Sequence, residues 1–372
     1  MLALFGLDPD FLHLNHGSFG ALPNVVREAY NAISQEVERN PDLFIRRCLG
    51  QRMREVRRRL AAHLKAHEDE CVLIPNVTHG INLILRSLPW SSGQDVLIYT
   101  STAFSQIKRN VFVAGGLPTS PILSEFSLDF PQTHMSILSQ FSRHIRAVKG
   151  KAASKTIRIA ALFDSIVSTP GVTMPWKGMV EICHAEGITS IVDAAHSLGQ
   201  EPINLSETQP DFWIGNCSKW LYAKRGSAVL YVAQREWLHR CCTSSHLSSQ
   251  TILDFDHILA LDFRLKIGGE KRIIDYCHTL AIEGGKCVAE ILGTEVMDMP
   301  EAPGELVGTM VNVLLPLPET IRPSPDVLRA FDQKLFSDRR AYAVIYYHNN
   351  CWWVRISAQV YNQVCLSFFS QV

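Results

Sequence analysis

The sequence has no long hydrophobic run and no excess of either charge. No stretch approaches the ~20 consecutive apolar residues that span a bilayer. The opening MLALFGLDPDF holds too short an apolar run for a signal peptide. We therefore expect no membrane partner and a cytoplasmic location. Lys+Arg and Asp+Glu are equal at 36 each, so no long-range positive field favours a nucleic-acid partner.

The sequence also lacks the cysteine spacings that mark disulfide frameworks and metal sites. Its ten cysteines are scattered, without a C-x-x-C pair or a Cys/His cluster. Reduced, mostly buried thiols are expected, including the adjacent Cys241 and Cys242. We predict no metal ligands.

What the chain does contain is an alternation of helical periodicity and short apolar stretches. Pro23 opens one helical pattern, and a second runs from about Gln51 to Ala66 with five arginines, which we expect on a solvated face that pairs with nearby acids. Short stretches rich in β-branched or aromatic residues follow, which is typical of buried strands. They are CVLI, DVLIYT, IRIAALF, GITSIVD, DFWIGN and SAVLYV.

This alternation predicts an α/β fold with two domains, since 372 residues exceed the usual size of a single core. Residues 14–243 are expected to form a large domain, with a mainly parallel (mixed) sheet covered by helices on both faces. Residues 244–372 are expected to form a smaller α+β domain, with an N-terminal arm of residues 1–13 packing near it. Its pattern shows a long helical stretch around Leu261 to Ile291, a helix near Asp326 to Phe336, and strands in TMVNVLL, YAVIYYH and CWWVRIS.

Polar residues follow several of the predicted strands, where open α/β sheets bind ligands. Asp193 comes directly after ITSIV, with His196 three residues further on, and Asp164 follows AALF. Placement alone leaves open whether Asp193 caps a helix or is a functional carboxylate.

Lys219 lies in the turn after the next strand, within NCSKWLYAKRGSAVLYV. A lysine in such a turn is commonly a solvated charge. Together with the upstream Asp193, it indicates instead a Schiff-base lysine, with the carboxylate holding the pyridinium nitrogen of pyridoxal 5′-phosphate.

The segment NVTHG, residues 76–80, lies where a turn opens a helix. Backbone N–H groups at a helix start, with the Thr78 hydroxyl, suit a phosphate dianion. A plain helix cap is the alternative for this segment.

Five motifs in order resemble the class V aminotransferase family of pyridoxal-phosphate enzymes, and most closely its isopenicillin N epimerase-like branch. They are HLNHGSFG, NVTHGIN, VDAAHSLG, NCSKWLYAKRGSAVLYV and WWVRISAQVYN, which extend through nearly the whole chain. The resemblance implies Lys219 as the catalytic residue that binds the cofactor, Asp193 at the pyridinium nitrogen, and His196 near the ring hydroxyl.

The resemblance implies further contacts around the cofactor and the substrate. Phe104, in STAFSQIK, matches the aromatic residue that stacks on the ring; a core phenylalanine is the alternative. Arg355 matches the arginine that binds the substrate carboxylate, and Asn15 and His16 border the substrate. The other cofactor-binding positions are Thr78, His79, Asp164, Asn216 and Ser218.

Two departures from the family pattern concern the cofactor phosphate. Ser218 stands where relatives usually have histidine before the lysine, and it reaches less far. The segment SSHLSSQTILDFDHILALDF is shorter than the family's glycine-threonine loop, in which Thr251 is the candidate for the threonine that contacts the phosphate in the neighbouring subunit.

The resemblance implies a homodimer that acts at Cα of a small amino-acid substrate. Epimerase-like or C–S lyase-like chemistry is placed first, and the branch includes enzymes of secondary metabolism. Aminotransferase and cysteine desulfurase are the alternatives within the family, although neither Cys351 nor Cys365 resembles a desulfurase nucleophile. The alternative from another class is a non-catalytic or truncated relative that keeps the fold as a binding or scaffold protein.

Overall fold

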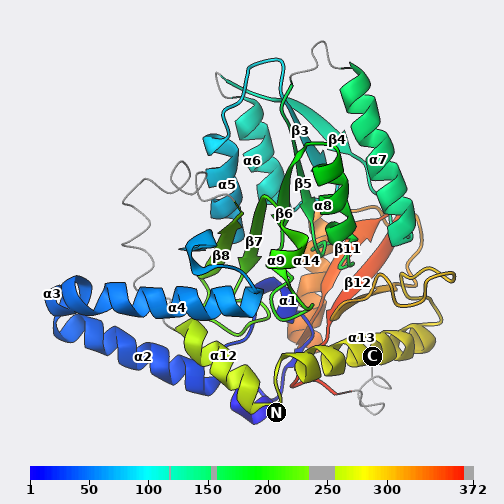
Figure 1. The fold of residues 1–372 in the computed structure, drawn as a ribbon. Helices are drawn as coiled ribbons and strands as arrows, with labels where there is room; N and C mark the ends of the chain where they lie inside the picture. Colours follow the sequence, from blue (N-terminus) through cyan, green and yellow to red (C-terminus); the bar gives the residue numbers. More distant parts are fainter. Residues whose placement is uncertain (117–118, 152–156, 234–255, 364–372) are drawn as a thin grey trace.

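The computed structural model describes residues 1–116, 119–151, 157–233 and 256–363. Its central feature is a seven-stranded sheet with the strand order β2-β8-β7-β6-β5-β3-β4 (Figure 1). The strands are β2 (Cys71–Ile74), β3 (Val96–Thr100), β4 (Ile122–Phe126), β5 (Ile159–Asp164), β6 (Thr189–Asp193), β7 (Phe212–Asn216) and β8 (Ala228–Val232). Strands β4, β3, β5, β6 and β7 run parallel, whereas β8 is antiparallel to both β7 and β2. The predicted mainly parallel, mixed sheet is confirmed.

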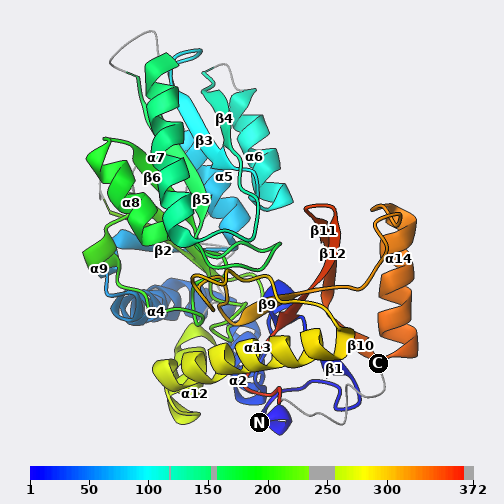
Figure 2. The ribbon, with the colours of Figure 1, turned by 90° about the vertical axis from the view of Figure 1, so that its right-hand side faces the viewer.

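Helices cover both faces of this sheet, as the two views of Figures 1 and 2 show. The pair α5 and α6 lies on one face and the pair α7 and α8 on the other; their bounds are Val77–Ser87, Ser105–Gly115, His134–Lys151 and Trp176–Ala185. In β5, Ala160 and Leu162 pack toward the first pair, and Ala161 and Phe163 toward the second. Burial on both faces explains why the strand reads as a continuous apolar run.

Strand β4 was missing from the predicted strands. It is the edge strand of the sheet, and its sequence ILSEF mixes the half-buried Ser124 and the exposed Glu125 with an exposed Ile122. An edge strand pairs with a neighbouring strand on one side only, so it lacks the apolar run that identifies its buried neighbours.

Three helices pack together beside the sheet: α2 (Asn24–Arg39), α4 (Leu49–Leu64) and α12 (Asp256–Lys266). Four of the five arginines of α4 pair with acids, as predicted: Arg52 with Glu36, Arg57 with Asp69, Arg58 with Glu55, and Arg59 with Asp262.

A second, antiparallel sheet has the order β11-β12-β9, with β9 at Met310–Leu314, β11 at Val344–His348 and β12 at Cys351–Ser357. Helix α13 (Glu270–Leu292) packs against β9, and α14 is Pro325–Gln333. The prediction of one helical stretch from Leu261 to Ile291 is wrong. Gly268 and Gly269, with φ of 129° and 83°, separate α12 from α13, because only glycine adopts such angles readily.

Backbone pairing and side-chain hydrogen bonds both connect the second sheet and its surroundings to the rest of the chain. Strand β1 (Leu12–His13) pairs in parallel with β10 (Ala341–Tyr342). The Asn312 side chain of β9 accepts from the backbone N–H of Gly171 and donates to its carbonyl, both at 3.0 Å. The predicted domain boundary at residues 243 and 244 lies outside the described residues, so the division stays a prediction.

The remaining elements are short: η1 (Leu2–Leu4), α1 (His16–Phe19), α3 (Pro41–Leu43), η2 (Phe44–Cys48), η3 (Glu68–Glu70), α9 (Leu205–Thr208) and η4 (Lys334–Asp338). None of the helices in the described ranges combines the length and apolar character needed to cross a bilayer. Within those same ranges, no three His, Cys, Asp or Glu side chains gather in a way that could hold a metal ion.

Candidate functional site

The site is built where the parallel strands end. Asp164 ends β5 and Asp193 ends β6, and the two residues lie opposite each other in register. Thr100, at the end of β3, donates its hydroxyl to Asp164 Oδ2 at 3.1 Å, and Asp193 Oδ1 accepts from the backbone N–H of Ala195 at 3.0 Å. The chain after Asp193 forms turns rather than a helix, so the helix-capping alternative for this residue is wrong.

The two carboxyl groups are buried, and this controls their charge. Burial raises the pKa of Asp193 to about 6, while the positive charge of Lys219 acts in the opposite direction. Burial and the negative charge of Asp193 raise the pKa of Asp164 well above its ordinary value. One negative charge is therefore favoured over two, because like charges in a buried site repel each other strongly.

The amine of Lys219 points into this site. Its Nζ lies 3.0 Å from Nε2 of the buried His196, and His196 Nδ1 accepts from the indole N–H of Trp220 at 3.2 Å. Since an indole N–H only donates, the neutral imidazole carries its proton on Nε2 and donates it to Lys219. This contact requires an uncharged amine.

The pKa shifts agree with that arrangement. Burial lowers the pKa of Lys219 to about 8, and burial with the nearby charge of Lys219 lowers the pKa of His196 well below its ordinary value. A lysine with a lowered pKa holds more free amine near neutral pH, and the free amine is the form that attacks an aldehyde.

Arg355, on β12, is a buried cation whose bonds are to neutral groups. It donates to the carbonyl of Ser168 at 2.6 Å, to Asn15 Oδ1 at 2.7 Å and to Ser18 Oγ at 2.9 Å. Its Nε has no partner, and within the described part of the chain it forms no ion pair with an acid. The positive charge of Arg355 lowers the pKa of Lys219, so the two side chains act on each other electrostatically. Arg355 therefore retains charge and a donor for a bound carboxylate.

The predicted phosphate segment meets the lysine segment at the start of α5. Asn76 caps this helix by accepting from the backbone N–H of His79 at 2.8 Å, so the cap is Asn76 itself. Asn216, at the end of β7, accepts from the backbone N–H of Val77 at 3.4 Å. Thr78 is half-buried and His79 is exposed. The positive end of α5 thus lies beside the strand that leads to Lys219.

The other predicted site residues differ in exposure and in the groups that they contact. Phe104 precedes α6 with 47% of its surface exposed, so the core alternative is wrong. Ser218 is half-buried, and Asn15 contacts Arg355. His16 is buried with both ring nitrogens bonded inside the protein, which leaves neither for a substrate. Thr251 lies outside the described residues.

Sequence reasoning missed several residues that contact the site's backbone or side chains, among them Thr100, Trp220 and Arg264. Thr100 is the last residue of the strand VLIYT, so the rule that ligands bind at the carboxyl ends of parallel strands could have found it. Arg264 lies in the last turn of a helix, where an arginine is ordinarily an exposed surface charge.

These residues fit pyridoxal phosphate. The Lys219 amine is the nucleophile that an aldehyde needs, and the Asp193 carboxylate accepts from a protonated pyridine nitrogen. The helix start at Asn76 supplies donors for a phosphate, and the unpaired Nε of Arg355 supplies one for a substrate carboxylate. The fold is that of the fold-type I pyridoxal-phosphate enzymes.

Comparison with known proteins defines the family. The class V aminotransferase model matches residues 143–255. The L-cysteine desulfhydrase-like protein lolT1 of Epichloe uncinata is 31% identical, over 98% of this chain and 92% of that protein. Isopenicillin N epimerase of Streptomyces clavuligerus is 27% identical, over 61% of this chain and 54% of that protein. The chain belongs to the class V aminotransferase family, whose cofactor is pyridoxal 5′-phosphate.

A solved structure supports the same fold. The K223A mutant of C-DES, with glycine covalently linked to its pyridoxal-phosphate cofactor, has a TM-score of 0.80 at 16% identity, covering 100% of this chain and 97% of that one. The predicted family and fold class are confirmed.

Proposed function

We propose that this protein is a pyridoxal-phosphate-dependent C–S lyase that acts at Cα of a small, sulfur-containing amino acid. The observation that carries the proposal is the Lys219 amine, which lies 3.0 Å from His196 and has its pKa lowered to about 8, together with Arg355, which pairs with no acid among the described residues and whose charge acts on that amine. An amine for the cofactor and a cation for the substrate carboxylate are the two anchors that an α-amino acid needs. The likeness to an L-cysteine desulfhydrase-like protein supports a substrate with sulfur at Cβ.

Each site residue has a proposed part in holding the cofactor, whose pyridine ring draws electrons from Cα when it is bound. Asp193 keeps the ring nitrogen protonated, with Asp164 behind it, and Phe104 stacks on the ring. His196 borders the ring hydroxyl. The phosphate side is formed by Thr78, His79, Asn216, Ser218 and, from a neighbouring subunit, Thr251.

The substrate end of the site follows from Arg355 and its partners. The guanidinium pairs with the substrate carboxylate, and Asn15 and Ser18 hold the guanidinium in place. Lys219 then takes the proton from Cα, because a displaced amine with a pKa near 8 is suited to accept and return a proton at neutral pH. Loss of that proton allows the β-sulfur to leave.

A desulfurase mechanism has little support in this chain. Such a reaction needs a nucleophilic cysteine, and burial raises the pKa of both Cys71 and Cys277 to about 12. Cys351 begins β12 and packs against the main core. Cys365, Cys241 and Cys242 lie outside the described residues.

The test supplies purified protein and pyridoxal phosphate with L-cysteine, L-cystine and S-alkyl-L-cysteines in heavy water. Release of sulfide from cysteine, of thiol from the S-alkylcysteines or of persulfide from cystine, each with pyruvate and ammonia, supports the lyase, and Lys219→Ala should abolish it. Deuterium at Cα with the D-amino acid and no sulfur release would indicate an epimerase instead. Transfer of the amino group to a keto acid would indicate an aminotransferase.

The non-catalytic alternative is separated by cofactor binding. A scaffold protein would show no visible absorption band when pyridoxal phosphate is added, and no loss of a band after borohydride. We also propose a homodimer with the large and small domains as divided above, and sedimentation at micromolar concentration tests it: a monomer alone would refute the dimer.

A further inference from the structure

The imidazole of His16 lies between the lysine segment and the C-terminal part of the described chain. Its Nε2 is 2.7 Å from the carbonyl oxygen of Lys219, and its Nδ1 is 2.9 Å from the hydroxyl of Tyr361. Since a carbonyl only accepts, Nε2 carries the proton, and Nδ1 accepts from the tyrosine hydroxyl. Burial lowers the pKa of His16 to about 3, so the ring is neutral and donates to Lys219 throughout the working range of pH.

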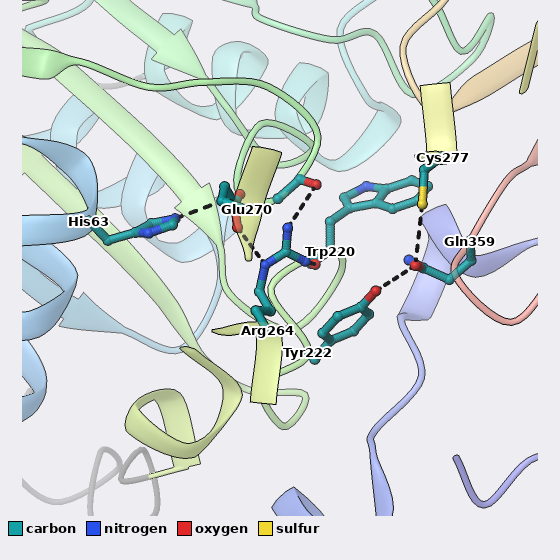
Figure 3. A network of polar contacts seen from close by, with 8 residues as sticks. His63, Trp220, Tyr222, Arg264, Glu270, Cys277 and Gln359 are labelled. Atoms are coloured by element: carbon teal, nitrogen blue, oxygen red, sulfur yellow. Dashed lines mark hydrogen bonds and ion pairs between the residues drawn. The ribbon is translucent and has the colours of Figure 1, made fainter. Parts of the chain in front are cut away.

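The guanidinium of Arg264, on α12, holds the next carbonyl along the chain (Figure 3). It donates to the carbonyl of Trp220 at 2.8 Å and to that of Gly199 at 3.4 Å. Glu270 accepts from its Nε at 2.6 Å, and this side chain of Arg264 is only 2% exposed. The acid fixes the orientation of the guanidinium, so its remaining donors face the two carbonyl groups.

The side chains of Lys219 and Trp220, whose carbonyl groups are bonded as above, also form hydrogen bonds. The Lys219 amine contacts His196, and His196 accepts from the Trp220 indole. Tyr222, two residues after Trp220, has φ of 71°, an angle that costs free energy in a residue with a side chain. A turn of this kind keeps its shape only when its surroundings hold it.

We propose that His16 and Arg264 are positioning residues for Lys219: each holds one of two consecutive carbonyl groups, and together they fix the turn from which the amine reaches the site. This inference rests on the proposed function and adds two residues to it. Neither side chain touches the amine, so both act through the backbone. The two residues come from segments far apart in the chain, and a shift of either one moves the amine relative to His196.

The test measures the pH at which Lys219 becomes acetylated in cofactor-free protein, by mass spectrometry, and the dissociation constant of pyridoxal phosphate from its visible band. In His16→Leu and Arg264→Met the amine should leave its buried position, which raises the acetylation midpoint by about one pH unit or more. Cofactor binding should weaken about tenfold. His16→Gln, which keeps a donor at the position of Nε2, should restore most of both values.

Three variants separate position from charge and from stability. Arg264→Lys keeps the positive charge but reaches one carbonyl at most, so a midpoint between those of wild type and Arg264→Met supports positioning. Arg59→Met breaks the ion pair to Asp262 that fastens the same helix to α4, and it should lower the unfolding temperature without moving the midpoint. Tyr361→Phe removes only the hydroxyl beside His16 and should raise the midpoint partway.

Wild-type midpoints in both His16→Leu and Arg264→Met would overturn the inference. If those two variants do not fold, an unchanged midpoint in both Tyr361→Phe and Arg264→Lys overturns it instead. A wild-type protein without a visible band refutes the proposed function, while the acetylation midpoints still test the positioning. If the wild-type protein shows the visible band and the variants have the acetylation midpoints of wild type, the positioning alone is refuted.

Discussion

Asp164 and Asp193 end two neighbouring parallel strands in register, so two buried carboxyl groups lie side by side at the carboxyl edge of the sheet. Their surroundings differ. Thr100 donates to Asp164, whereas Asp193 accepts from the backbone beyond it. Because burial and the charge of Asp193 both raise the pKa of Asp164, the pair divides into one carboxylate that keeps its charge and one carboxyl group that holds a proton more firmly.

Asp193→Asn should remove most of the activity while the protein still binds the cofactor. The amide keeps the shape of the side chain but loses the charge that stabilises a protonated ring nitrogen. Loss of one such group costs about 100-fold or more in turnover. Steady-state rates and the position of the visible band check this. A rate within tenfold of wild type would mean that another residue holds the ring nitrogen.

Asp164→Asn should change the pH dependence of stability. A carboxyl group with a raised pKa in the folded protein contributes stability that is complete below its unfolded pKa and is lost as the pH rises through the folded pKa. The amide removes this loss. Urea unfolding of cofactor-free protein at pH 4 and pH 8 should therefore show a larger free energy of unfolding at pH 8 for the variant, and little difference at pH 4.

Arg355→Gln should weaken substrate binding through the carboxylate. A charge-assisted hydrogen bond contributes about 1.5–3 kcal/mol, so KM should rise about 10- to 100-fold. Arg355→Lys should recover part of this, since it keeps the charge without the planar donor pair. The control is binding of cysteamine, an amine without a carboxylate, followed by the change in the visible band. If the variant lost affinity for cysteamine equally, the arginine would not be a carboxylate site.

Gly20→Ala should disturb the lysine turn from the N-terminal side. Gly20 has φ of 71°, and a Cβ at this position would overlap the carbonyl oxygen of Ser218. Gly93, with φ of 69° and no atom within 4 Å of an added Cβ, is the matched control. Gly93→Ala carries the backbone strain alone, about 1 kcal/mol. Calorimetry and cofactor titration should show a larger loss of stability, with weaker cofactor binding, only for Gly20→Ala.

Much of the fold could be predicted because strands buried on both faces read as apolar runs, as in β5 and β6. The edge strand β4 and the break at Gly268 and Gly269 could not. The edge strand mixes polar and apolar residues, so it shows no apolar run. A pair of glycines can lie inside a helix or end it, and here the packing of the flanking helices requires the positive φ angles that end it.

The site shows the same division between local and distant signals. Asp193 ends β6 and Lys219 lies in the turn after β7, so their place at the carboxyl edge of the sheet could be predicted from local pattern. The bonds of His16 and Arg264 could not, since each acts on a carbonyl group far away in the chain. A histidine beside a loop and an arginine on a helix look alike in sequence whether they bind substrate, solvent or backbone.

The pair of hydrogen bonds between Asn312 and Gly171 fixes the segment that lies beside Arg355. Arg355, on β12, donates to the carbonyl of Ser168, and Gly171 packs against the stem of the same side chain. Residues 168 and 171 therefore contact both the guanidinium and the stem that carries it. In the proposed function, the guanidinium that binds the carboxylate is therefore already held in place before the amino acid arrives. Discrimination between one amino acid and another must then reside in the space left for the substituent at Cβ, and that is where substrate preference could be redesigned.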